Sequence, residues 1–266
     1  MVRALMRLNK FLSKSGIASR RKSDKLIKMA MTTVNEEIIL DPAYNVEEKD
    51  VVRFDGKLLK MDEEKIVIIL NKPKNVITSV SDQFGRKTVM HFLKSKKRLA
   101  PIGRLDKDST GLLLLTNDGD LHQYLTHPKN QIPRQYVVII EKIIESSKLK
   151  RISRGLSIGD GEIGRAKVIS QKIVKGRCEA KLELRQGKKR EVRRIFRSVK
   201  IKLFSLHRVS FGSIKVGSLK IGESRLLEEN EVEQLKNKIY RKWVIVFIFC
   251  QWSKFLVTSP AYWDCK

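Results

Sequence analysis

The chain has few of the residues that build disulfide scaffolds or metal sites. It contains 3 cysteines in 266 residues, Cys178, Cys250 and Cys265, and their wide spacing fits neither a disulfide framework nor a zinc site. The odd number of cysteines is typical of a reducing compartment such as the cytoplasm. The 4 histidines form no ligand pattern either. The sequence therefore predicts no metal and no cofactor.

Long apolar runs are also missing. The run Trp243–Cys250 is wholly apolar, but polar residues from Gln251 onwards interrupt it well short of the ~20 residues that a membrane-spanning helix needs. Basic residues such as Arg7 break up the N-terminus, where a signal peptide would carry its apolar segment. We expect no membrane anchor, and we assign residues 237–266 as an atypical hydrophobic tail of unknown role.

Acidic residues are scarce relative to basic ones. The chain has 29 Asp and Glu residues against 56 Lys and Arg residues, which gives a formal net charge of +27 that internal ion pairs cannot balance. Such a charge attracts polyanions, so nucleic acid is the expected partner and an anionic membrane surface is the weaker alternative. The length allows one large domain, or a small domain followed by a larger one.

The first sixty residues predict two basic helices and a small sheet. Apolar residues recur at helical spacing from Leu5 to Leu12, and Gly16 is placed to end that helix. Ser19 is a suitable N-cap for a second helix over residues 20–29. Short strands are predicted at 33–34, 37–40 and 51–54. We assign residues 1–60 as a small domain and residues 61–65 as a linker.

Residues 66–236 mix strands and helices without strict β–α–β alternation, which predicts an α+β domain. The helix at 189–199 is the clearest, because its apolar residues fall on one face. The segment Asn71-Lys72-Pro73 is expected to end the first strand. Strands are predicted at 66–70, 112–116, 136–141, 162–170, 179–185 and 203–211, with further helices at 119–126, 145–156 and 228–240.

The most informative segment is 103–119, in which Asp106 lies between Arg104 and the turn that ends at Gly111. A carboxylate among basic side chains is held ionised, so Asp106 is suited to act as an anion. On spacing alone it could equally be an ordinary turn residue. The segment also imitates the start of a calcium loop, but Thr110 and Asn117 occupy two of the ligand positions, which excludes a calcium site.

Two further groups of residues are candidates for a site. Tyr136 begins a predicted strand, and the segment from Lys189 to Arg197 carries a dense run of basic side chains. Each also has a structural interpretation. Tyr136 could be a plain strand aromatic, and the basic run could be the solvated face of an amphipathic helix.

Taken together, four segments in consistent order resemble the RsuA family of pseudouridine synthases, particularly members that modify large-subunit ribosomal RNA. Residues 7–21 resemble the family's small S4-type RNA-binding domain, and residues 103–119 resemble its catalytic motif. Residues 134–138 and 187–194 resemble its second and third motifs. The resemblance implies that the S4-type domain precedes a catalytic domain at 66–236, built on a mainly antiparallel mixed sheet with flanking helices.

The resemblance also implies a reaction, the isomerisation of a specific uridine in RNA to pseudouridine. Asp106 would attack the sugar carbon or stabilise the charge that develops there, and Arg193 would pair with Asp106. Tyr136 would lie against the uracil ring and pass a proton late in the reaction. The target nucleotide has to be flipped out of the RNA, and Arg104 would fill the vacated position or hold the adjacent phosphate.

Further basic residues would contact RNA phosphates: Arg190, Arg194 and Arg197 beside the catalytic motif, and Lys10, Arg20 and Arg21 in the first domain. The partner would be ribosomal RNA or a pre-ribosomal particle, bound by a cytoplasmic monomer without a small-molecule cofactor. Two alternatives remain open on the sequence. One is a non-catalytic RNA-binding or ribosome-associated protein with a relic synthase domain, and the other is a membrane-peripheral basic protein.

Overall fold

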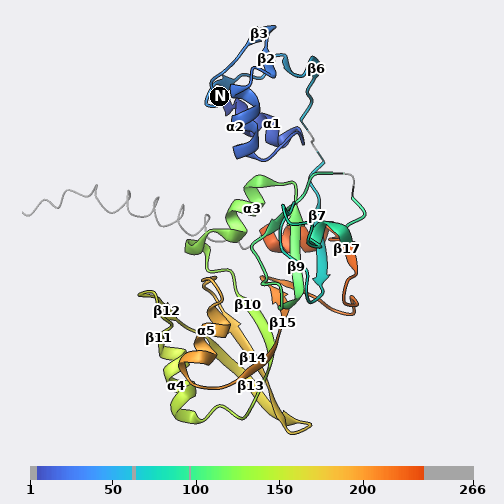
Figure 1. The fold of residues 1–266 in the computed structure, drawn as a ribbon. Coiled ribbons are helices and arrows are strands. Elements are labelled where there is room, and N and C mark those ends of the chain that lie inside the picture. Colours follow the sequence, from blue (N-terminus) through green and yellow to red (C-terminus); the bar gives the residue numbers. More distant parts are fainter. Residues whose placement is uncertain (1–4, 62–63, 96, 237–266) are drawn as a thin grey trace, which may run out of the picture.

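The computed structural model describes residues 5–61, 64–95 and 97–236. A small N-terminal unit stands at one end, and a long sheet with flanking helices makes up the rest (Figure 1). The predicted hydrophobic tail and the end of the helix predicted at 228–240 lie outside the described residues, within which that helix covers residues 229–236. None of the helices in the described ranges is long and apolar enough to cross a membrane.

The N-terminal unit consists of two helices, a sheet of four short strands and a separate pair of strands. Ser19 caps α2 as predicted, because its hydroxyl accepts a hydrogen bond of 3.3 Å from the amide of Lys22. The first helix begins later than predicted, at Leu8, since the chain first forms a short strand. The elements are β1 (Met6–Arg7), α1 (Leu8–Lys14), α2 (Arg20–Lys28), β2 (Thr32–Val34), β3 (Glu37–Ile38), β4 (Asn45–Val46), β5 (Val52–Phe54) and β6 (Lys57–Leu58).

The larger unit is built on a nine-stranded mixed sheet. Seven strands follow the order β13-β14-β10-β15-β9-β7-β17, and every pair is antiparallel except β15 with β9. These strands are β7 (Val67–Lys72), β9 (Thr110–Thr116), β10 (Arg134–Ile140), β13 (Lys167–Val174), β14 (Arg177–Leu184), β15 (Leu203–Phe211) and β17 (Ser224–Leu226). Off this path, β8 (Ala100–Ile102) pairs with β9, and β16 (Ile214–Lys215) pairs with β15. The fold is therefore α+β, as the sequence predicts.

Helices pack on the sheet and contribute apolar side chains to its hydrophobic clusters. The helix α5 (Glu191–Ser198) buries Val192, Ile195 and Phe196 in the same hydrophobic cluster as strands β10 and β14. In Figure 1, α5 and α4 (Ser146–Arg154) lie together over that part of the sheet, beside the small hairpin of β11 (Leu156–Ser157) and β12 (Ile163–Gly164). The third helix, α3 (Gly119–Thr126), follows β9, and single 3-10 turns are formed by Val89–Phe92 and Pro128–Asn130.

Two sequence predictions are wrong in detail. The segment Asn71-Lys72 does not end the first strand but belongs to it, pairing with Leu112 and Gly111, and the strand ends before Pro73. Proline cannot donate the next ladder hydrogen bond, so the stop lies at the proline itself. The strand predicted at 162–170 is divided into β12 and the longer β13, which reaches Val174.

The parallel contact between β15 and β9 depends on one glycine. It consists of two residue pairs, His207 with Thr110 and Arg208 with Gly111. A Cβ atom at Gly111 would lie 2.3 Å from the carbonyl oxygen of Arg208, and the φ of Gly111 is +106°. Only glycine fits both the space and the backbone angle. This close approach places the loop before β9, which carries Asp106, next to strands that come from the distant end of the sequence.

Candidate active site

A buried lysine holds the loop that carries Asp106. The side chain of Lys72 is completely buried, and its ammonium group donates to the carbonyl oxygens of Asp106 (3.1 Å), Lys107 (3.3 Å) and Ser109 (2.8 Å). A further bond of 3.0 Å goes to the carbonyl of Pro73. Burial lowers the pKa of Lys72 from 10.5 to about 8, although the negative charges of Asp106 and Asp108 oppose the shift. Lys72 thus fixes the backbone of the loop from inside the protein.

The carboxylate of Asp106 faces helix α5. Its oxygens lie 3.5 Å from Nε of Arg193 and 3.9 Å from Nε of Arg190. The side chains of Asp106 and Arg193 are 32% and 29% exposed, so this pair is shielded from water but open on one side. Arg193 also donates to the hydroxyl of Ser109 at 3.4 Å. The structure therefore brings together the carboxylate of Asp106 and the guanidinium of Arg193, as the resemblance implies.

Helix α5 is oriented by a second set of contacts at its start. Glu191 is buried, and its carboxylate accepts hydrogen bonds from the amides of Lys188 (3.2 Å) and Arg165 (3.4 Å). Burial nevertheless raises the pKa of Glu191. A negative side chain in the first turn also interacts favourably with the helix dipole. These contacts fix the first turn of α5, from which Arg193 reaches Asp106.

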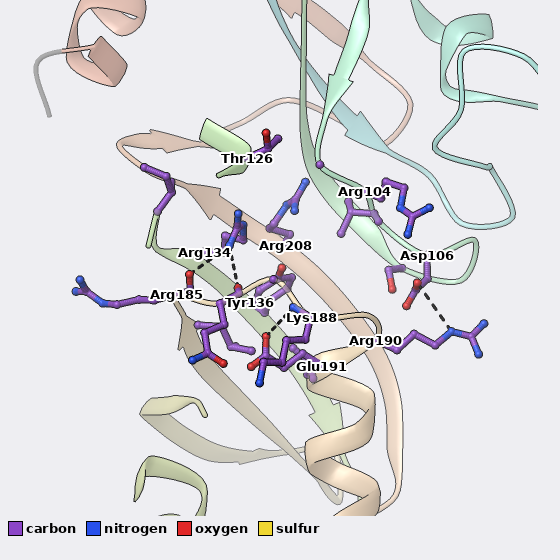
Figure 2. A pocket seen from close by; sticks show the side chains of 18 of the residues that line it. Arg104, Asp106, Thr126, Arg134, Tyr136, Arg185, Lys188, Arg190, Glu191 and Arg208 are labelled. Atoms are coloured by element: carbon purple, nitrogen blue, oxygen red, sulfur yellow. Dashed lines mark hydrogen bonds and ion pairs between the residues drawn. The ribbon is translucent and has the colours of Figure 1, made fainter. Parts of the chain in front are cut away.

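Tyr136 shares a pocket with this pair. The pocket has a volume of about 510 Å³ and is lined by Asp106, Tyr136 and Arg193 among other residues. Tyr136 lies on β10 and packs against two hydrophobic clusters at once, one under α5 and one on a face of the neighbouring strands β7 and β9. Figure 2 shows Asp106 on one side of this pocket and Tyr136 on the β10 side, with Arg190 reaching toward Asp106.

The remaining basic residues predicted beside the catalytic motif divide into two groups. Arg104 and Arg190 are exposed and line the pocket. Arg197 is exposed on α5, on the face that it shares with Arg193 by helical spacing, although it lies outside the pocket lining. These three side chains are exposed at or near the pocket mouth, where Arg190 also lies 3.9 Å from the carboxylate of Asp106.

Arg194, which is also predicted to contact RNA, differs from them in its surroundings. Its side chain is 14% exposed, and all five N–H donors of its guanidinium are already engaged. It therefore holds the hairpin of β11 and β12 against α5 and has no donor left for a phosphate. The acceptors are the carbonyls of Ile158 (2.7 Å), Gly159 (2.6 Å) and Lys189 (3.3 Å) and the carboxylates of Asp160 (3.1 Å) and Glu162.

The three predicted residues of the N-terminal unit lie elsewhere. Lys10, Arg20 and Arg21 line a second cavity, of about 530 Å³, between this unit and the start of α3. Lys10 lies 3.5 Å from the carboxylate of Asp120 on α3, and Lys14 lies 3.7 Å from it. These basic residues are therefore separate from the pocket of Asp106, and they border the junction between the two parts of the chain.

Sequence reasoning assigned no role in the site to three basic residues: Lys72, Arg134 and Arg208. The signal for Lys72 was a lysine directly before Pro73, two residues after the apolar run 66–70, which we interpreted as the end of the strand. Arg134 and Arg208 both line the pocket, and Arg208 is only 2% exposed. Among the residues that the structure describes, no cluster of three or more His, Cys, Asp or Glu side chains could hold a metal ion.

Comparisons with known proteins agree with this architecture. The profile of the RNA pseudouridylate synthase family matches residues 66–198, and that of the S4 domain matches residues 6–52. A relative from Bacillus subtilis, named ribosomal large subunit pseudouridine synthase B, is 35% identical over 86% of this chain and 95% of its own length. An uncharacterized RNA pseudouridine synthase of Aquifex aeolicus is 37% identical over 90% of this chain and 97% of its own.

A solved structure is similar as well. The crystal structure of a pseudouridylate synthase has a TM-score of 0.62 and 29% sequence identity to this protein, covering 86% of this chain and 99% of the other. Fold and sequence thus define an RNA pseudouridine synthase in which an S4 domain precedes the synthase domain. The chain belongs to the RsuA family of these enzymes, the family that its four motifs predict.

Proposed function

We propose that this enzyme converts one specific uridine of large-subunit ribosomal RNA to pseudouridine, with Asp106 as the nucleophile. The observation that carries this proposal is the placement of the Asp106 carboxylate, 3.5 Å from Arg193, on the wall of a pocket that Tyr136 also lines. An oriented anion, a paired cation and an aromatic side chain around one cavity suit a reaction at the sugar carbon of a nucleoside.

The proposed reaction begins at that carbon. The carboxylate of Asp106 attacks C1′ or stabilises positive charge there while the bond from C1′ to N1 of uracil breaks, and the uracil leaves with the electron pair. Arg193 and Arg190 hold the carboxylate in position through charge-assisted contacts. Because the loop backbone is fixed by Lys72, the carboxylate needs little reorganisation to reach C1′.

The second half of the reaction re-forms the bond through carbon. The uracil turns within the pocket and its C5 bonds to C1′, which breaks any bond from C1′ to Asp106 and releases the carboxylate. The proton on C5 is then lost while N1 gains one, so the overall change is an isomerisation. Tyr136 is assigned two roles here: its ring lies against the uracil, and its hydroxyl transfers the proton. The walls of the pocket retain the detached base, which prevents hydrolysis from replacing isomerisation.

Access to the pocket requires a flipped-out nucleotide, at a cost of a few kcal/mol. Arg104 at the pocket wall is placed to fill the vacated position or to hold the adjacent phosphate. Arg190 and Arg197 would contact phosphates beside the site, and Lys10, Arg20 and Arg21 would contact RNA at the domain junction. We propose that the substrate is ribosomal RNA, free or in a pre-ribosomal particle, and that the enzyme acts as a monomer in the cytoplasm.

The test is a direct assay of the full-length protein. Unmodified transcripts of large-subunit and small-subunit ribosomal RNA are incubated with it, and pseudouridine is mapped by carbodiimide modification and primer extension. We expect one site in the large-subunit transcript, modified nearly to completion. Modification of the small-subunit transcript alone would refute the proposed target. Tight binding to both transcripts with no pseudouridine in either would instead identify a non-catalytic RNA-binding protein.

A further inference from the structure

Arg208 is a buried cation with few partners. It lies on β15 and is 2% exposed. Its Nε donates to the carbonyl of Leu112 at 2.6 Å, whereas its buried Nη2 has no hydrogen-bond partner. No carboxylate of residues 5–61, 64–95 or 97–236 lies within ion-pair distance of it. Arg208 nevertheless lines the pocket that contains Asp106.

A second arginine lies beside it. Arg134 and Arg208 both stack near the ring of Phe211, with guanidinium carbons 5.0 Å and 5.3 Å from the ring centre. Arg134 donates to the backbone carbonyls of Gln186 (2.8 Å) and Arg185 (3.5 Å). In the described part of the chain it forms no ion pair, although the carboxylate of Glu191, in the same pocket, is close enough to act on its charge. Figure 2 shows the two guanidinium groups side by side, on the side of the pocket that Thr126 borders.

The strand pairing explains why these groups converge. Tyr136 on β10 is opposite Arg208 on β15, with an irregularity in register just before Tyr136. Arg134 precedes Tyr136 by two residues on the same strand and therefore faces the same side of the sheet. The two arginines thus lie next to the tyrosine that is assigned to the uracil ring.

Arg208 is buried and Arg134 beside it is half-buried, and two neighbouring cations that form no ion pair are energetically unfavourable in such surroundings. Burying a charge costs several kcal/mol unless it is paired, and like charges close together add to that cost. The fully bonded Arg194, with two carboxylates among its five acceptors, shows how this protein satisfies an arginine that has only a structural role. Within the described residues, Arg134 and Arg208 form no such ion pair, and the single nearby carboxylate of Glu191 cannot balance both charges, so the cavity that they border favours a ligand with negative charge. A uracil carbonyl could accept a hydrogen bond but would leave both charges unbalanced.

We infer that Arg134 and Arg208 form an anion subsite in the pocket, which binds an RNA phosphate attached to the target nucleoside. The inference rests on the proposed function, because the nucleoside itself would occupy the space between this subsite and Asp106. The subsite binds and positions the substrate without taking part in bond making. It would hold the sugar through its phosphate while the base is detached.

The test is a binding measurement that needs no turnover. The full-length protein is titrated calorimetrically, at constant ionic strength, with uridine 3′,5′-bisphosphate, uridine and inorganic phosphate. A charge-assisted hydrogen bond contributes enough that we expect the bisphosphate to bind the wild type at least about tenfold more tightly than uridine. Arg208→Met and Arg134→Met should each remove most of this advantage. Arg154→Met, at an exposed position on α4, should keep it.

Several outcomes would overturn the inference. Equal binding of bisphosphate and uridine by the wild type is one, and an advantage that survives in both Arg208→Met and Arg134→Met is another. Binding of inorganic phosphate as tight as that of bisphosphate, with the same dependence on Arg208, would identify free phosphate as the ligand instead. Thermal melts establish whether each variant folds. If Arg208→Met does not fold, Arg208→Lys takes its place, and an advantage of bisphosphate over uridine that survives in both Arg208→Lys and Arg134→Met would overturn the inference. An Arg208-dependent advantage in an enzyme that makes no pseudouridine would refute the proposed function and leave the subsite standing.

Discussion

The ammonium group of Lys72 lies 3.1 Å from the carbonyl oxygen of Asp106 and so joins strand β7 to the loop of the candidate nucleophile. The carboxylate of the same aspartate is held from the opposite direction, by Arg193 on α5 at 3.5 Å. Backbone and side chain of Asp106 are therefore fixed by two cations from distant parts of the sequence. Each of these contacts can be removed separately.

Removing the lysine should loosen the loop. Lys72→Met leaves the carbonyls of Asp106, Lys107 and Ser109 without their buried donor, and an unsatisfied buried polar group costs about 1–3 kcal/mol. We expect the free energy of unfolding to fall by about 2–4 kcal/mol, measured by urea denaturation. Lys74→Met, at an exposed position two residues away, is the matched control and should change it by less than about 0.5 kcal/mol. Equal effects of the two changes would refute the buried role of Lys72.

The lowered pKa of Lys72 predicts a specific pH dependence of stability. Its value of about 8 in the folded protein is below the ordinary value of 10.5, so between these pH values the unfolded chain binds more protons than the folded one. The contribution of this group to stability therefore rises as the pH increases through that window. The free energy of unfolding of the wild type should increase relative to that of Lys72→Met over the same range. A constant difference would mean that Lys72 titrates normally.

If Asp106 is the nucleophile, replacing it should abolish turnover and leave RNA binding nearly unchanged. Asp106→Asn keeps the shape of the side chain but removes its negative charge, so turnover on ribosomal RNA should fall at least about a thousandfold. The dissociation constant for the RNA should change by less than about threefold, because phosphate contacts supply most of the affinity. Asp108→Asn, at an exposed position in the same loop, should remain active. Substantial isomerisation by Asp106→Asn would remove Asp106 from the nucleophile role.

Two neighbouring arginines on α5 should respond in opposite ways. Arg194→Gln breaks a buried set of hydrogen bonds and should lower the free energy of unfolding by about 2–4 kcal/mol. Arg197→Gln should leave stability unchanged but weaken RNA binding, and it should reduce the slope of log affinity against log salt by about 1. Urea denaturation and filter binding at several salt concentrations separate these effects. The reverse result would return Arg194 to the RNA-binding residues.

The strand junction beside the loop should tolerate no side chain. Gly111→Ala places a Cβ atom against the backbone of Arg208 at a positive φ, so we expect a loss of at least about 3 kcal/mol in the free energy of unfolding. Gly119→Ala is the control, because no atom lies within 4 Å of its added Cβ. Circular dichroism during thermal unfolding distinguishes the two. Normal stability of Gly111→Ala would mean that β9 and β15 are not in contact there.

Local patterns predicted much of the fold and singled out Asp106, whereas the pairing of Asp106 with Arg193 was implied only by the resemblance to the RsuA family. The apolar face of the helix that contains Val192 and Phe196 was visible from spacing alone, and so was the cap at Ser19. Asp106 stood out because its turn, its basic neighbours and the following apolar strand are contiguous. The helix face, the cap and the turn at Asp106 are each determined by neighbouring residues in the chain, so the sequence alone is enough to predict them.

The missed residues depend on long-range contacts. Lys72 was interpreted as a strand stop, since nothing local shows that four carbonyls converge on its ammonium group. Arg194 was grouped with Arg197 by charge, because its acceptors lie 5 to 36 residues away in the chain. Arg134 and Arg208 meet only through the pairing of β10 with β15. In each case the deciding partner comes from another element.

The parallel contact of β15 with β9 has a mechanical consequence. Two residue pairs connect the part of the sheet that carries α5 and Arg193 to the part that carries Asp106. The neighbouring antiparallel pairs, β10 with β15 and β7 with β9, each run over six or more residues. Bending of the sheet is therefore easiest along this line, and Tyr136 packs across it against the clusters on both sides. Bending at this short contact would move Arg193 and Asp106 relative to each other, so the pocket can open and close without unfolding of any helix or strand.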